Sequence, residues 1–162
     1  MHTKLAFHKD VKPSNIFLTS DWQVRVGDLG ASCDIKQVVP IHGTEQWMAP
    51  EVRLGKGFHP TSDVYGIGFL TYFIIARRNP YELKQDWLIN YKPDKANSGF
   101  GCWMHEVMHG CMRTNTEDRL SFKEIKKVVM FWLFKVYCES NDKALHKKAE
   151  ALVRRLDFDI SY

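Results

Sequence analysis

The chain has 162 residues, of which 44% are hydrophobic and 26% are charged, and its formal net charge is +4. This is the composition of an ordinary globular protein, and the length allows one domain with a real core but excludes two large ones. The charge is too small to indicate nucleic-acid binding, because the basic residues form no long block before the C-terminal segment.

The cysteines and the longest apolar run exclude two further classes of protein. Four cysteines are scattered along the chain without a C-x-x-C pair, which predicts reduced thiols in an intracellular, cytoplasmic protein, with a nuclear one not excluded. The longest apolar run, residues 64–76, is shorter than a membrane span and contains two glycines. We therefore expect a buried core helix there and no membrane span.

The β-type segments come first in the chain. The runs NIFL, starting at Asn15, and VRV, starting at Val24, are separated by turn residues, and this pattern predicts a small β-hairpin. Residues 31–44 are mixed in character and predict a loop. Ser62 and Asp63 precede the apolar run as helix N-cap signals.

The rest of the chain reads mostly as helix. Residues 79–99 are interrupted by prolines and a glycine and predict loops with short turns. Apolar residues at helical spacing predict a helix over 103–112, and a capping box of Ser121 and Glu124 predicts another helix that runs to about Tyr137. Asp142 is suited to cap a last helix. The expected fold is therefore mainly α within the α+β class, a small β-hairpin with a helical bundle.

A phosphoryl-transfer pattern occupies the stretch HKDVKPSN, from His8 to Asn15. Asp10 is placed to accept the proton of a hydroxyl nucleophile, Lys12 to neutralise phosphate charge, and Asn15 to hold a divalent metal. Asp28 follows the second β run and is itself followed by a glycine, which suits a metal ligand that faces phosphates.

Three motifs occur in the order and spacing of one family. His8-Lys9-Asp10 with Asn15 is similar to a catalytic loop, Asp28-Leu29-Gly30 to a magnesium loop, and Ala49-Pro50-Glu51 to the end of an activation segment. Over residues 2 to about 137 the chain resembles the eukaryotic-type protein kinase family, and Lys12 and Thr44 resemble its serine/threonine branch. The resemblance implies a kinase C-terminal lobe over residues 1–140, followed by a basic amphipathic helix and tail over 141–162.

The resemblance assigns the chemistry to five residues. It implies that Asp10 orients or deprotonates the substrate hydroxyl and that Lys12 contacts the γ-phosphate of ATP. It implies that Asn15 and Asp28 bind Mg²⁺ and that Phe17 forms the floor under the adenine. Lys12 and Asn15 have an alternative interpretation as loop-shaping hydrogen-bonding residues.

Structural roles are implied for six more residues. Thr44 would hydrogen-bond towards the catalytic loop and help to select a hydroxyl substrate. Glu51 would form a buried ion pair with Arg119, and Asp63 would accept backbone N–H bonds from the catalytic loop. His8 and Leu29 would stack in the apolar column that couples the two kinase lobes. Related proteins without activity would keep the ion pair and Asp63 as well.

Two departures from the family pattern bear on regulation and activity. Lys9 stands where the family has an arginine that grips a phosphate on the activation loop, and residues 33–43 contain no serine, threonine or tyrosine. We therefore expect no switching by phosphorylation in the middle of this loop. Only seven residues precede His8, so the glycine-rich loop, strand lysine and helix glutamate of an N-terminal lobe are expected to lie outside this chain.

Two functions follow as expectations. The first is a protein serine/threonine kinase, of which this chain is the catalytic C-lobe. The kinase would transfer the γ-phosphate of ATP to protein hydroxyls with Mg²⁺, and this chain by itself would have negligible turnover. Its partners would be a protein substrate and either another kinase or a separate N-lobe, with no nucleic acid. The alternative is a stand-alone truncated kinase-like module, a pseudokinase or decoy that binds or inhibits other kinases.

A competing motif, HEVMH, runs from His105 to His109 and matches the H-E-x-x-H pattern of zinc proteases. The apolar stripe of this segment already defines the buried face of a helix. His105, Glu106 and His109 fall mainly off that face, so ordinary polar residues on a solvated helix side are the preferred interpretation. The basic residues after 142 are interpreted as a solvated helix face, with docking to an anionic surface as the alternative.

Overall fold

A computed structural model describes residues 6–21, 23–34, 43–77 and 100–139, together with positions 143, 144, 147 and 150. These residues divide into two units, Met1–Ser121 and Phe122–Tyr162, and the site discussed below lies within the first. The described strands are β1 (Ala6–Phe7), β2 (Ile16–Leu18), β3 (Val24–Val26) and β4 (Cys33–Asp34). The described α-helices are α1 (Pro50–Arg53), α2 (Ser62–Ala76), α4 (Phe100–Cys111) and α5 (Phe122–Glu139).

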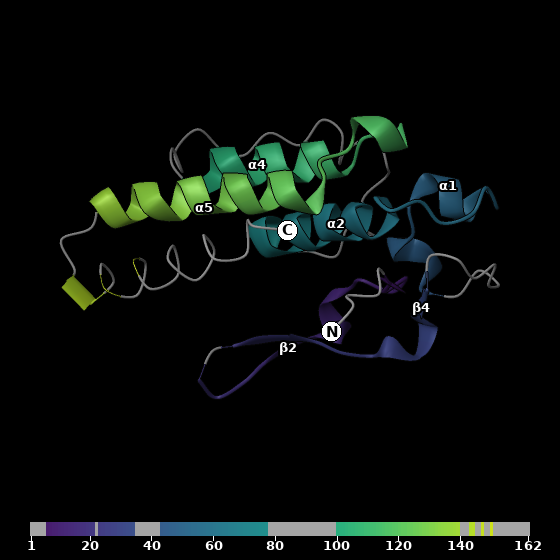
Figure 1. The fold of residues 1–162 in the computed structure, drawn as a ribbon, viewed down its shortest axis with the longest axis horizontal. Coiled ribbons are helices and arrows are strands. Elements are labelled where there is room, and N and C mark those ends of the chain that lie inside the picture. The colour runs from purple at the N-terminus through teal and green to yellow at the C-terminus, as the bar shows by residue number, and fades with distance from the viewer. Residues whose placement is uncertain are drawn as a thin grey trace. The chain divides into compact units, whose positions relative to one another are not determined.

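The mainly helical fold with a small β portion is confirmed, and all described strands lie before residue 35 (Figure 1). The predicted hairpin is β2 and β3, which pair antiparallel with Ile16 opposite Val26 and Leu18 opposite Val24. The structure adds a second short pair, β1 with β4, within which Phe7 lies opposite Cys33. That pair joins the start of the catalytic-loop segment to the residues that follow the DLG motif.

Helix α2 forms the centre of the first unit. Its residues Tyr65, Phe69 and Tyr72 are buried and cluster with Met48, Ala49, Val52 and Met108. The apolar run predicted this buried helix, but the helix begins at Ser62, two residues before the run, and no side chain caps it. Ser62 and Asp63 therefore do not act as caps. They lie inside the first turn, where their side chains bind other segments.

Helix α4 packs along α2 through small residues. A Cβ atom on Gly68 would lie 2.4 Å from Cγ of Met112 and 3.2 Å from the carbonyl oxygen of Met108. Such distances are shorter than van der Waals contact, so the two helices approach this closely only because residue 68 lacks a side chain. Of the two glycines in the apolar run, Gly68 thus serves helix packing, whereas Gly66 lies against Val11 of the catalytic-loop segment, where a Cβ atom would be 3.1 Å from the Val11 carbonyl oxygen.

Helix α5 in the second unit begins directly after Ser121 and extends two residues beyond the predicted end at Tyr137. Of the predicted last helix, positions 143, 144, 147 and 150 have helical backbone and the remainder lies outside the described residues. The predicted loops over 79–99 lie outside them too. Within the described residues, none of the helices is both long and apolar enough to cross a membrane.

Candidate active site

The catalytic-loop segment is held to helix α2 by Asp63. Its Oδ2 accepts a hydrogen bond from the backbone N–H of His8 at 2.7 Å, and its Oδ1 accepts one from the N–H of Lys9 at 2.8 Å. Asp63 and Lys9 are buried. Two charge-assisted bonds from one buried carboxylate therefore fix the backbone that leads into Asp10.

The backbone at this point is unusual. Lys9 has φ 68°, and Asp28 has φ 60°, so both occupy the left-handed region. This conformation costs non-glycine residues free energy and persists only where the surroundings enforce it. The backbone N–H groups of Lys9 and of the preceding His8 both donate to Asp63, and these two bonds supply that enforcement at Lys9.

The carboxylate of Asp10 is the centre of a four-residue hydrogen-bonded cluster. Its Oδ2 lies 2.7 Å from Nζ of Lys12 and accepts from Nδ2 of Asn15 at 3.1 Å. Its Oδ1 accepts from the backbone N–H of Thr44 at 2.9 Å, and Nζ of Lys12 also donates to Oγ1 of Thr44 at 2.6 Å. The structure thus brings Asp10, Lys12, Asn15 and Thr44 together, although Thr44 is far away in the sequence.

The protonation state of Asp10 follows from these contacts. Burial of the carboxyl raises its pKa, but the hydrogen bonds from Lys12, Thr44 and Asn15 outweigh this effect and hold the pKa of Asp10 below its ordinary value. Asp10 is therefore a carboxylate at neutral pH.

The second motif is tied to the first by Gly27, the residue before Asp28. The N–H of Gly27 donates to the carbonyl oxygen of Asn15 at 2.9 Å, and its carbonyl oxygen lies 3.0 Å from Nε2 of His8. These two contacts anchor the start of the DLG motif beside the catalytic loop. Asp28 itself is exposed.

The donor set fits a hard divalent cation. Both hydrogen bonds of the Asn15 side chain use Nδ2, one to Oδ2 and one to the carbonyl oxygen of Asp10, so neither occupies Oδ1. Asp28 offers a solvent-facing carboxylate. An amide oxygen and a carboxylate, with water completing the shell, are the ligands that Mg²⁺ takes in proteins.

The remaining predicted residues are more exposed. The ring of Phe17 is 53% exposed and lies against Gly27, where a Cβ atom would be 2.7 Å from Cε2 of the ring. His8 uses its ring to hold Gly27, and Leu29, which the resemblance places in the same apolar column, is 65% exposed.

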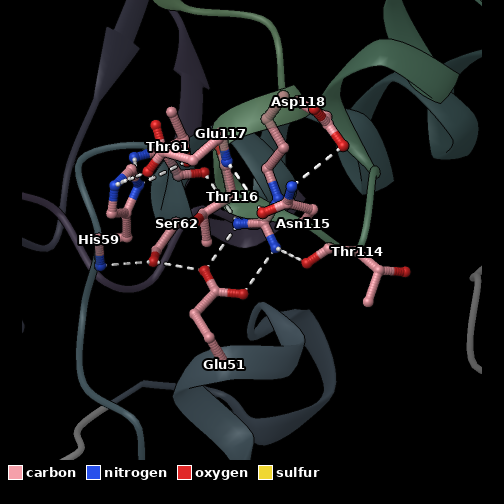
Figure 2. A network of polar contacts seen from close by, with 10 residues as sticks. Glu51, His59, Thr61, Ser62, Thr114, Asn115, Thr116, Glu117 and Asp118 are labelled. Carbon is pink, nitrogen blue, oxygen red and sulfur yellow. Dashed lines mark hydrogen bonds and ion pairs between the residues drawn. The ribbon is translucent and has the colours of Figure 1, made fainter.

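Glu51 and Arg119 form a two-pronged ion pair in which Arg119 is buried and Glu51 is partly buried. Nη1 and Nη2 of Arg119 each donate to one carboxylate oxygen of Glu51 at 2.6 Å. Burial raises the pKa of Glu51, but the bonds from Arg119 and Ser62 outweigh this effect and hold the pKa below its ordinary value. Figure 2 shows the surrounding network, where Ser62 Oγ donates to Glu51 at 2.7 Å and accepts from the N–H of His59.

Sequence reasoning missed two members of these networks. Ser62 was interpreted as a helix cap, and only its contact with Glu51, eleven residues away, shows its part in the ion-pair network. Phe58 carried no sequence signal at all, yet its ring lies 4.9 Å from Nζ of Lys9. This cation–π contact holds a buried ammonium that has no hydrogen-bond partner among the described residues.

Comparison with known proteins agrees with this geometry. Residues 1–131 match the family described as the protein kinase domain. The chain belongs to the eukaryotic-type protein kinase family. This kinase chain is 32% identical over 133 residues to a probable LIM domain-containing serine/threonine-protein kinase of Dictyostelium discoideum, a match that covers 77% of the chain and 20% of the relative.

Two other relatives carry serine/threonine kinase names. A CBL-interacting serine/threonine-protein kinase 8 of Arabidopsis thaliana is 30% identical over 145 residues, which cover 84% of the kinase chain and 32% of the relative. The serine/threonine-protein kinase PknA of Mycobacterium tuberculosis is 35% identical over 85 residues, 49% of the chain and 20% of the relative. The kinase chain thus matches less than a third of the length of each of these relatives.

Proposed function

We propose that this chain is the catalytic C-lobe of a protein serine/threonine kinase and transfers the γ-phosphoryl group of ATP to protein hydroxyls. The observation that carries the proposal is the Asp10 carboxylate, which is ionised, buried, and bonded at once to Lys12, Asn15 and Thr44. An exposed surface loop has no need of such an arrangement.

The hydrogen bonds of Asp10 leave room for a substrate. A carboxylate offers about four acceptor positions, two on each oxygen. Oδ2 accepts from the side chains of Lys12 and Asn15, whereas Oδ1 accepts from the backbone N–H of Thr44. The substrate hydroxyl would therefore donate to Oδ1 of Asp10.

The low pKa of Asp10 decides how this carboxylate works. A weakly basic carboxylate hardly deprotonates a hydroxyl before the transfer begins. Its first role is therefore to orient the hydroxyl oxygen towards phosphorus. As the new O–P bond forms and the bond from phosphorus to the leaving diphosphate breaks, the hydroxyl proton passes to Oδ1 of Asp10 and then to solvent.

The cationic and metal-binding groups complete the proposal. Nζ of Lys12, held between Asp10 and Oγ1 of Thr44, would place positive charge beside the transferring phosphoryl group. Asn15 and Asp28 would hold Mg²⁺, which supplies charge neutralisation at the phosphates when bound. Phe17 would lie under the adenine, and Glu51, Arg119 and Asp63 would keep the segments in place.

The hairpin supports an ATP-holding lobe as a partner. The pairing of β2 with β3 places Leu18, Val24 and Val26 on one face and Phe17 on the other, and all four side chains are more than half exposed. Apolar residues exposed on both faces of a hairpin indicate a surface that another polypeptide segment covers. We propose that an N-lobe covers this hairpin surface. The N-lobe would belong to a longer form of the chain or be a separate polypeptide, and the protein would act inside the cell.

The test uses the coding DNA upstream of Met1. We expect it to encode, in frame, a glycine-rich loop and a strand lysine, and the longer protein should transfer labelled phosphate from Mg·ATP to serine and threonine residues. Asp10→Asn should lower that rate at least about 100-fold. Asp21→Asn, at an exposed turn residue of the hairpin, is the matched control and should change the rate little. Equal rates for the two variants would refute the role of Asp10.

The exposed hairpin also favours a second function, a stand-alone module that binds other kinases. In that case no upstream lobe would be encoded, the chain by itself would transfer no phosphate, and it would bind an active serine/threonine kinase through the hairpin. Leu18→Glu should then abolish binding. Both functions predict that the isolated chain transfers no phosphate. A magnesium-dependent transfer by the isolated chain, abolished by Asp10→Ala, would contradict this expectation.

A further inference from the structure

Helix α4 carries a pair of histidines whose ring nitrogens face each other. Nε2 of His105 lies 2.9 Å from Nε2 of His109, and the ring centroids are 4.1 Å apart at an interplanar angle of 60°. The two residues are four positions apart, so one helical turn places them on the same side of α4. Two side chains of a kind that binds transition metals thus converge on one point.

The packing of α4 explains why both rings are held in this arrangement. Met104, Val107, Met108 and Cys111 are buried, and they fix which side of the helix faces inwards. His105 and His109 lie at the margin of that side and are half-buried, whereas the neighbouring Glu106 is exposed. A half-buried ring has fewer accessible rotamers than an exposed one. Folding has therefore already removed part of the side-chain entropy that would otherwise be lost when a metal ion binds.

We propose that His105 and His109 chelate a divalent first-row transition metal ion through their Nε2 atoms. Metal–imidazole bonds of about 2.0–2.1 Å put two tetrahedral ligand atoms about 3.3–3.4 Å apart and two ligands at right angles about 2.8–3.0 Å apart. The two Nε2 atoms, 2.9 Å apart, are close enough for both to reach one ion. Imidazole nitrogen is a suitable ligand for Cu²⁺, Ni²⁺ and Zn²⁺.

The site is a two-ligand chelate and not the centre of a zinc protease. Among the described residues, no group of three or more histidine, cysteine, aspartate or glutamate side chains is placed to hold a metal ion. Water, or a donor group from a bound molecule, would fill the other positions of the metal. The site shares no residue with the phosphoryl-transfer cluster, so it stands or falls independently of kinase activity.

The experiment is a calorimetric titration of the whole chain with Ni²⁺, in a buffer that does not bind metal and with a reductant that does not bind metal. We expect one ion to bind per chain and thermal unfolding to shift upwards as Ni²⁺ is added. His105→Gln and His109→Gln should each weaken binding at least tenfold. His59→Gln is the matched control, because His59 is also half-buried but contacts Thr61 and Glu117, away from α4. The His59→Gln variant should bind Ni²⁺ as tightly as the unaltered chain does.

A second measurement works even if a variant does not fold. In the nuclear magnetic resonance spectrum of the unaltered chain, substoichiometric Ni²⁺ should broaden the imidazole signals of His105 and His109 before those of the other five histidines. If these two signals do not broaden first, or if the glutamine variants bind Ni²⁺ as tightly as the unaltered chain, the proposal is wrong. The 2.9 Å contact is then only a hydrogen bond between the two rings.

Discussion

Glu51→Gln is expected to destabilise the first unit strongly, because Arg119 would keep its charge after its counter-ion is gone. The Arg119 side chain is 0% exposed and the Glu51 side chain 12% exposed. After the substitution, the guanidinium would still reach the carbonyl oxygens of Arg113, Thr61 and Thr114. Carbonyl dipoles do not replace a full negative charge at 2.6 Å.

The size of the effect follows from burial. Removing one partner of a buried, two-pronged pair costs about 3–5 kcal/mol, whereas an exposed pair contributes about 0–1 kcal/mol. A domain of this size has a total stability of about 5–15 kcal/mol, so the variant would lose a large share of it. The ring centroid of Tyr65 lies 5.0 Å from the guanidinium carbon of Arg119. This cation–π contact reduces the loss of stability but does not neutralise the charge of Arg119.

Urea unfolding followed by far-ultraviolet circular dichroism measures this loss as a change in the free energy of unfolding. The matched control is Glu117→Gln, which removes an exposed carboxylate that lies 3.3 Å from Nε2 of His59; the two side chains are 78% and 35% exposed. The control should cost about 1 kcal/mol or less. If Glu51→Gln costs no more than Glu117→Gln, the ion pair does not stabilise the fold and the reasoning is refuted.

The same variant should change how stability depends on pH. In the folded chain the pKa of Glu51 lies below its ordinary value, so its contribution is fully present above the pKa of the unfolded chain. That contribution is lost as the pH falls through the folded-state pKa, because protonation then breaks the pair. Unfolding measured below about pH 5 should therefore show a shallower loss of stability in Glu51→Gln than in the unaltered chain.

Three further substitutions test other parts of the structure. Gly68→Ala should cost about 1–3 kcal/mol in urea unfolding, because its methyl group overlaps Met112, whereas Gly30→Ala, where a methyl group makes only ordinary contact, should cost much less. Ser32→Ala should leave phosphate transfer by the longer protein within about twofold, since Oγ of Ser32 makes only a 3.5 Å contact and the resulting loss is well below 1 kcal/mol. A large loss of activity would instead indicate control through this hydroxyl. Phe17→Ser should weaken ATP binding while unfolding changes little, because the ring is already 53% exposed, and unchanged ATP affinity would remove this residue from the adenine site.

The sequence by itself determined the local structure and the family. Turn residues between two β-type runs gave the β2–β3 hairpin, and the continuous apolar run gave the buried helix α2. Three short motifs in a fixed order gave the kinase family, which the family match over residues 1–131 confirms. These signals are readable because side-chain period and turn chemistry depend on residues only a few positions apart.

Only the tertiary structure decided which polar groups meet. Ser62 carries the sequence signal of a helix cap, yet it bonds Glu51, because folding brings α1 to the start of α2. The carboxylate of Asp10 accepts a hydrogen bond from the backbone N–H of Thr44, 34 residues away. Of the two glycines of α2, Gly68 lies against α4 and Gly66 against Val11. Distances and rotamers in the packed state determine which hydrogen-bond partners meet, and the local sequence determines neither of them.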